Sequence, residues 1–68
     1  MPSSVIRRFS YDRNRRELHV EFVTDRIYIY YDVPEQEAEA FRAAESKGRY
    51  FNFHIRDHYE FREVTAHS

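Results

Sequence analysis

Residues 17–22 read Glu-Leu-His-Val-Glu-Phe, and this stretch decides the fold. Its polar and apolar residues alternate strictly, which places Leu18, Val20 and Phe22 on one face of an extended chain and the polar residues on the other. The stretch therefore predicts a β-strand with one face directed into a core.

Two further strands are expected on either side of this one. Residues 5–11 alternate imperfectly and end at a segment that contains the turn formers Asp12 and Asn14. Residues 27–33 are rich in β-branched and aromatic side chains, which favour strands. Because the connecting segments are short, the three strands are expected to form an antiparallel meander.

Two helices are predicted after the strands. Pro34 suits the first position of a helix, since its missing N–H would have no partner there, and the helix is expected to run to about Ala44. Ser46 suits the N-cap of a short second helix that includes residues 49–56, although the alternating apolar residues from Phe51 onward also fit a strand. The expected fold class is α+β, with a three-stranded antiparallel meander followed by two helices packed on one face. Residues 59–64 are expected either to extend along the body or to pair with an edge strand.

The length and composition of the chain limit what it can be. A chain of 68 residues has room for one core, so a single domain over residues 1–68 is expected, with residues 1–3 and 65–68 frayed. Cysteine is absent, which excludes disulfides and thiolate zinc sites. No signal-peptide pattern or long apolar run is present, so we expect a cytoplasmic protein with no membrane partner.

The sequence resembles the KTSC domain over nearly the whole chain. The resemblance is carried by Tyr11-Asp12, the strand 17–22, Tyr28-Ile29-Tyr30 at the family's central YXY motif, Val33-Pro34, residues 46–52 and Ile55-Arg56. Asp25 stands where the family often has a glycine, which puts the type of that turn in doubt. The family occurs alone in small bacterial proteins and at the C-terminus of some lysyl-tRNA synthetases, and this context implies a role in RNA binding.

Tyr28 and Tyr30 share one face of their strand and are therefore candidates to stack successive RNA bases. The alternative, that both rings pack in the core, is favoured because sheet aromatics most often serve packing. Basic residues near the second helix and the first hairpin are candidates to bind phosphate. The full set of candidate RNA contacts is Tyr28, Tyr30, Lys47, Arg49, Asn52, Arg56, Arg7 and Arg16.

A protein interface is the alternative function. If Phe22 pairs with Tyr28, the YXY face is buried and an apolar strip lies on the outer face of the sheet, comprising Val23, Ile27, Ile29 and Tyr31. Six Tyr and six Phe are a large apolar load for so short a chain, and no disulfide stabilises its core. A homodimer that buries the strip is therefore expected under this alternative.

Catalytic and metal sites are not expected. His54 and His58 have a spacing that can hold zinc, but the sequence offers no third ligand. No nucleophile elbow or phosphate loop is present, and a small chain leaves little wall for a pocket of the usual ~300–1,000 Å³. We expect no cofactor, no small-molecule substrate and no enzyme activity. The leading hypothesis is a non-catalytic module for tRNA-like or structured RNA, whose net charge of −1 argues against nonspecific polyanion binding.

Overall fold

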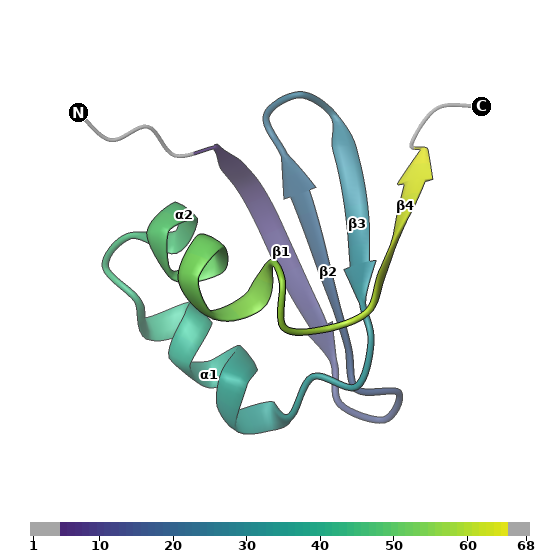
Figure 1. Ribbon diagram of the computed structural model, residues 1–68, viewed down its shortest axis with the longest axis vertical. Coiled ribbons are helices and arrows are strands. Elements are labelled where there is room, and N and C mark those ends of the chain that lie inside the picture. The colour runs from purple at the N-terminus through teal and green to yellow at the C-terminus, as the bar shows by residue number, and fades with distance from the viewer. Residues whose placement is uncertain (1–4, 66–68) are drawn as a thin grey trace.

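The computed structural model describes residues 5–65, in which a β-sheet carries helices on one face (Figure 1). In chain order the elements are β1 (Ile6–Asp12), β2 (Glu17–Phe22), β3 (Arg26–Tyr30), α1 (Glu35–Ala43), α2 (Lys47–Tyr50), a π-helical turn η1 (Phe51–Ile55) and β4 (Phe61–Thr65). The predicted α+β class is confirmed. Fraying was predicted at residues 1–3 and 65–68: Thr65 is instead the last residue of β4, and the other predicted residues lie outside the described part of the chain.

The sheet has four antiparallel strands in the order β1-β2-β3-β4, so the prediction of three strands is wrong. After the helices the chain returns to pair β4 with β3, which places Phe61 opposite Tyr30 and Thr65 opposite Arg26 (Figure 1). Two charged residues, Arg62 and Glu63, occupy the middle of β4, one on each face, so the strand lacks an apolar alternation. Its partner strand, β3, is also distant in sequence, and a pattern within one short segment cannot indicate such a pairing.

The register of β2 and β3 places the YXY residues on the face that the helices cover. Leu18 lies opposite Tyr30 and Val20 opposite Tyr28, and directly opposed residues point to the same face. Val20 rather than Phe22 is therefore the partner of Tyr28, a shift of two residues that keeps the same face inward. Tyr30 is 3% exposed, so core packing is the correct interpretation for that ring, while Tyr28 is half-buried.

The turn between β2 and β3 keeps the backbone shape that a glycine would favour. Asp25 has a φ of 70°, in the left-handed region that Asp tolerates better than most residues. The departure from the family pattern at this position therefore leaves the turn intact. In the turn before it, the Asp12 carboxylate accepts hydrogen bonds from the backbone N–H groups of Asn14 and Arg15, at 3.0 and 3.2 Å.

Helix α1 packs on β1. Pro34 is its N-cap and not its first helical residue as predicted, so the helix begins one residue later, at Glu35. It ends at Ala43. Ala38 and Phe41 are buried, and the Phe41 ring lies 4.5 Å from that of Phe9 on β1. The small Ala38 allows the helix to lie close to the strands.

The segment 49–56 is helical, as predicted, and not a strand. Ser46 caps α2, because its Oγ accepts a hydrogen bond from the backbone N–H of Arg49 at 3.3 Å. The helix then widens into η1, which buries Phe51 and Ile55. Within residues 5–65, no helix is long and apolar enough to cross a membrane.

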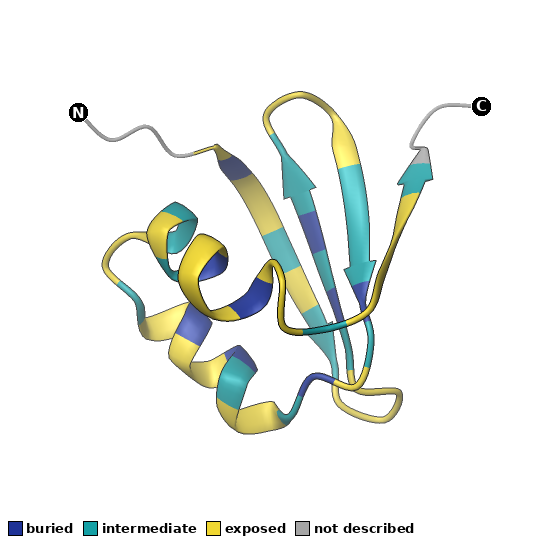
Figure 2. Ribbon diagram, viewed as in Figure 1, coloured by how far each residue is buried: buried dark blue, intermediate teal, exposed yellow. Residues whose placement is uncertain are grey.

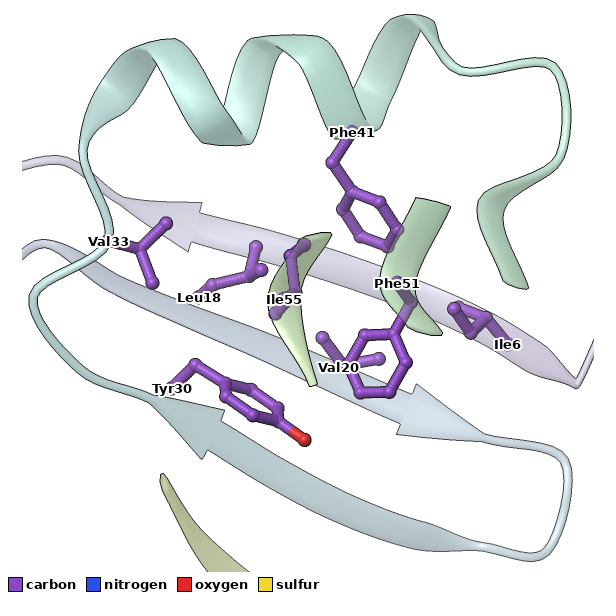
Figure 3. Close-up of a cluster of buried hydrophobic side chains, with 8 residues drawn as sticks. All are labelled: Ile6, Leu18, Val20, Tyr30, Val33, Phe41, Phe51 and Ile55. Carbon is purple, nitrogen blue, oxygen red and sulfur yellow. The ribbon is translucent and has the colours of Figure 1, made fainter. Parts of the chain in front are cut away.

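The core lies between the helices and the inner face of the sheet. Figure 2 shows buried residues on β2 and on the helices, whereas residues 61–64 of β4 are exposed or intermediate. Figure 3 shows the main cluster: Ile6, Leu18, Val20, Tyr30, Val33, Phe41, Phe51 and Ile55. Burying a side chain such as Leu18 or Phe41 stabilises the fold by about 1.5–3 kcal/mol.

Candidate nucleic-acid interface

A groove of about 490 Å³ lies on the inner face of the sheet, over β3 and β4. Five aromatic residues from β2, β3, η1 and β4 line it: Phe22, Tyr28, Tyr30, Phe51 and Phe61. The volume lies within the ~300–1,000 Å³ usual for ligand sites. The groove is open to solvent, so it is a surface groove of this size and not a water-excluding pocket.

The five rings form one continuous cluster. Tyr28 lies between Phe22 and Phe61, with ring centroids 5.5 Å apart in both pairs. Tyr30 contacts Phe51 and Phe61, at 5.4 Å in each case. Tilted and edge-to-face pairs at these distances attract one another, so the cluster gives the groove an ordered aromatic floor.

Exposed apolar side chains gather along this groove. Of the four large hydrophobic residues that are exposed within the described part of the chain, three line it: Val5 (45%), Val23 (49%) and Phe61 (53%). The fourth, Phe53, is 67% exposed and lines a separate, smaller hollow beside α2. A concentration of exposed apolar groups marks a binding surface more often than scattered ones do.

Polar groups complete the wall of the groove. The η1 turn and the residue after it present Asn52 and Arg56, whose guanidinium contacts the Asn52 Oδ1 at 3.5 Å. Arg26 lies 3.6 Å from Glu63 on β4, and Asp57 has no ion pair or hydrogen bond within residues 5–65. π-Helical turns often occur at functional sites. Guanidinium groups suit phosphates and base edges, and the amide and carboxylate suit base edges.

The Tyr30 hydroxyl also belongs to this wall. Figure 3 shows the hydroxyl directed away from the buried cluster, and no described group hydrogen-bonds it. Burial, together with repulsion from the negative charge of an ionised Tyr28, raises the pKa of Tyr30 to about 12, so the hydroxyl is protonated at neutral pH. It can donate a hydrogen bond to a ligand in the groove.

One carboxylate fixes the position of the helical wall. Glu37 on α1 accepts hydrogen bonds from the hydroxyl of Tyr50 on α2 and from that of Tyr59, the latter at 2.8 Å. Burial and these hydrogen bonds raise the pKa of both tyrosines to about 12. Glu37 thus ties α1 to α2 and to the segment that leads into β4.

The structure brings together four of the eight candidate RNA contacts: Tyr28, Tyr30, Asn52 and Arg56 line the groove. The other four lie elsewhere. Lys47 donates to a backbone carbonyl at the end of α1, and Arg49 lines the separate hollow. Arg7 pairs with two carboxylates, the nearer at 2.8 Å, and Arg16 is exposed in the turn between β1 and β2. Because Tyr30 is buried, its ring face is not available to stack a base.

The four residues predicted to form an outer apolar strip do not form one surface. Ile27 and Ile29 are half-buried on the outer face, opposite Glu21 and His19. Val23 lies in the turn and lines the groove on the inner side. Val23 is therefore separated from the two isoleucines, which Glu21 and His19 flank on the neighbouring strand.

Sequence reasoning missed several groove residues, namely Phe22, Phe51, Phe61, Arg26 and Asp57, as RNA contacts. The signal that points to them is the excess of aromatic residues, five of which meet here. His54 and His58 are both exposed, and within residues 5–65 no three His, Cys, Asp or Glu side chains are grouped to hold a metal ion.

Comparison with known proteins gives consistent similarities. The family model of the KTSC domain matches residues 2–59. A lysine–tRNA ligase from Nostoc punctiforme is 36% identical over 62 residues, which are 91% of this chain, and the chain spans only 11% of that ligase. An uncharacterized protein from Stutzerimonas stutzeri is 38% identical over 52 residues, covering 76% of this chain and 73% of that protein. The crystal structure of a KTSC domain protein from Yersinia pestis has 33% identity and a TM-score of 0.85, covering 94% and 93% of the two chains.

Proposed function

This chain belongs to the KTSC family, and from that premise we propose that it is a non-catalytic module that binds unpaired segments of tRNA-like or structured RNA. The observation that carries the proposal is the meeting of an aromatic floor with two arginines in one groove. Readers of single-stranded RNA stack bases on aromatic rings and hold the backbone with cations. The similar segment in a lysine–tRNA ligase supports a role connected with tRNA.

In this proposal a base lies against the exposed edge of the ring cluster. Phe61 is exposed and Tyr28 and Phe22 are half-buried, whereas Tyr30 and Phe51 are buried. Arg26 and Arg56 contact the phosphates and base edges beside it. A chain of net charge −1 makes few phosphate contacts, so affinity is modest and falls with salt, by a logarithmic slope of about −0.7 per contact for single strands.

Titration of labelled tRNA and of single-stranded RNA at low salt, followed by fluorescence anisotropy, tests the proposal. Arg56→Glu is expected to weaken binding by about tenfold or more, because it reverses a charge in the groove. Arg49→Glu is the matched control, since it makes the same charge change one helical segment away and outside the groove. If neither RNA binds at micromolar protein, the proposal fails.

An interaction with protein is a second candidate, because the exposed Val5, Val23 and Phe61 can also accept apolar side chains of a partner or of a second copy. The edge strand β1 is poorly suited to pair with another copy, since a register shift between Ile6 and Arg8 interrupts it.

A homodimer would raise the melting temperature with protein concentration, because assembly is linked to stability by mass action. Ile29→Lys is expected to abolish that rise if the outer face is the interface, and to leave RNA binding unchanged. Light scattering that reports a monomer up to millimolar concentration would exclude the dimer.

A further inference from the structure

The polar wall of the groove has a composition that distinguishes one RNA base from another. Asn52, Arg56, Asp57 and the Tyr30 hydroxyl line it together. Among the groove residues within 5–65, Asp57 is the only one with a carboxylate. A carboxylate only accepts hydrogen bonds, whereas the other three groups can donate them.

These groups lie close enough to influence one another. The carboxylate of Asp57 raises the pKa of the Tyr30 hydroxyl, and the guanidinium of Arg56 lowers it, although burial is the largest cause of the net rise. Asn52 Oδ1 is already in contact with the Arg56 guanidinium, which leaves the amide NH₂ of Asn52 as a donor. Asp57 itself has no hydrogen bond or ion pair among residues 5–65, so its oxygens are available to a ligand.

The four RNA bases present different groups to such a wall. Guanine has two adjacent donors, N1–H and the 2-amino group, beside the acceptor O6, and two parallel donors match the two oxygens of a carboxylate. Adenine and cytosine have one amino donor next to an acceptor ring nitrogen, which faces a carboxylate oxygen unfavourably. Uracil has no amino group, and two carbonyl oxygens flank its single N–H.

We infer that the groove selects an unpaired guanine. The base lies against Tyr28 and Phe61, Asp57 accepts from N1–H and the 2-amino group, and the donors of Arg56 and Asn52 face O6. This inference rests on the proposed RNA-binding function and adds to it the identity of the base.

The test uses short oligouridines that carry a single central guanosine, inosine, adenosine or cytidine, with oligouridine itself as the reference. Inosine keeps N1–H and O6 but lacks the 2-amino group. The guanosine oligonucleotide is expected to bind about tenfold more tightly than oligouridine, because one bidentate contact gives discrimination of this order. Inosine is expected to lose most of that preference.

Asp57→Asn tests the role of the carboxylate, because it keeps the size of an exposed side chain and removes its charge. It is expected to reduce the preference for guanosine over oligouridine to less than about threefold. Glu60→Gln is the control, since Glu60 is exposed nearby and does not line the groove.

The outcomes separate the inference from the function on which it rests. Equal affinity for all the oligonucleotides overturns the selection of guanine and leaves RNA binding in place. A preference for guanosine that persists in Asp57→Asn overturns the assignment to Asp57. Failure of every oligonucleotide to bind overturns the proposed function itself.

Discussion

The β1–β2 half and the β3–β4 half of the sheet turn the same face toward the helices, but the first half is sealed except at Phe22, which lines the groove, whereas the second half is open. Above β1 and β2, Leu18, Val20 and Phe41 have no exposed surface. Above β3 and β4, Phe61 is 53% exposed, and Glu63 lies on the inner face opposite Tyr28 and is also exposed. Both halves carry large apolar residues, so the difference lies in the helical cover. The closed half holds the fold together, and the open half is available to a ligand.

The largest effect is expected in the closed half. Phe41→Ala removes a fully buried ring that contacts Phe9, and such truncations cost about 3–5 kcal/mol. A core of this size supplies roughly 3–5 kcal/mol in total, so the variant is expected to be largely unfolded at room temperature. Urea denaturation followed by circular dichroism measures the loss. A cost below about 1 kcal/mol would show that α1 does not seal this half.

In the open half, the effect on binding is expected to exceed the effect on stability. Phe61→Ala removes a half-exposed ring from the groove and is expected to cost about 1 kcal/mol of stability. Loss of the Phe61 ring is expected to weaken RNA binding by about 1–3 kcal/mol, the contribution of one base stacked on an aromatic side chain. Calorimetric unfolding and anisotropy titrations measure the two quantities.

Phe53→Ala is the matched control for that substitution. Phe53 is at least as exposed as Phe61 but lies outside the groove. It is expected to leave RNA affinity unchanged. Equal losses for the two variants would mean that exposure of an aromatic ring, and not its place in the open half, determines binding.

The closed half was largely predictable from the sequence, because local patterns determine it. The strict alternation of residues 17–22 gives the bounds of β2, and Ser46 marks the start of α2. The sequence leaves open whether residues 59–64 extend along the body or pair with an edge strand, because Arg62 and Glu63 remove the apolar alternation and the partner strand lies on the far side of the helical segment.

The open half was predictable only in part for the same reason. Tyr28, Asn52 and Arg56 belong to motifs of the family and could be named in advance. Phe61 and Asp57 reach the groove only because β4 docks on β3 and the chain after η1 turns toward it. A contact between segments that are distant in sequence is not indicated by the local spacing of apolar residues.

The smallest expected effect is on stability at high pH, through the hydrogen bonds by which Glu37 holds α1 to Tyr50 and Tyr59. The hydroxyls of Tyr50 and Tyr59 have pKa values raised from 10.0 to about 12 by burial and by hydrogen bonds to Glu37. Their protonated forms are favoured in the folded chain, so this contribution to stability is complete below pH 10 and is lost as the pH rises toward 12. Thermal melts across this range are expected to show a falling melting temperature.

Replacing both tyrosines, in the variant Tyr50→Phe with Tyr59→Phe, is expected to make that fall smaller. It does not vanish, because Tyr30 has a pKa raised to about 12 as well. An unchanged pH dependence in the double variant would show that the contacts with Glu37 do not secure the cover.

The pairing of β4 with β3 has a consequence for the order in which the molecule assembles. Strands β1, β2 and β3 are joined by short turns, whereas β4 meets its partner only after the whole helical segment is in place. Contacts between distant parts of a chain form late because the intervening loop must first be closed. The wall that carries Phe61 is therefore expected to form last and to open first in the folded state. Backbone amides of Phe61–Thr65 then exchange with solvent hydrogen sooner than those of β2, and a ligand held in the groove slows that exchange.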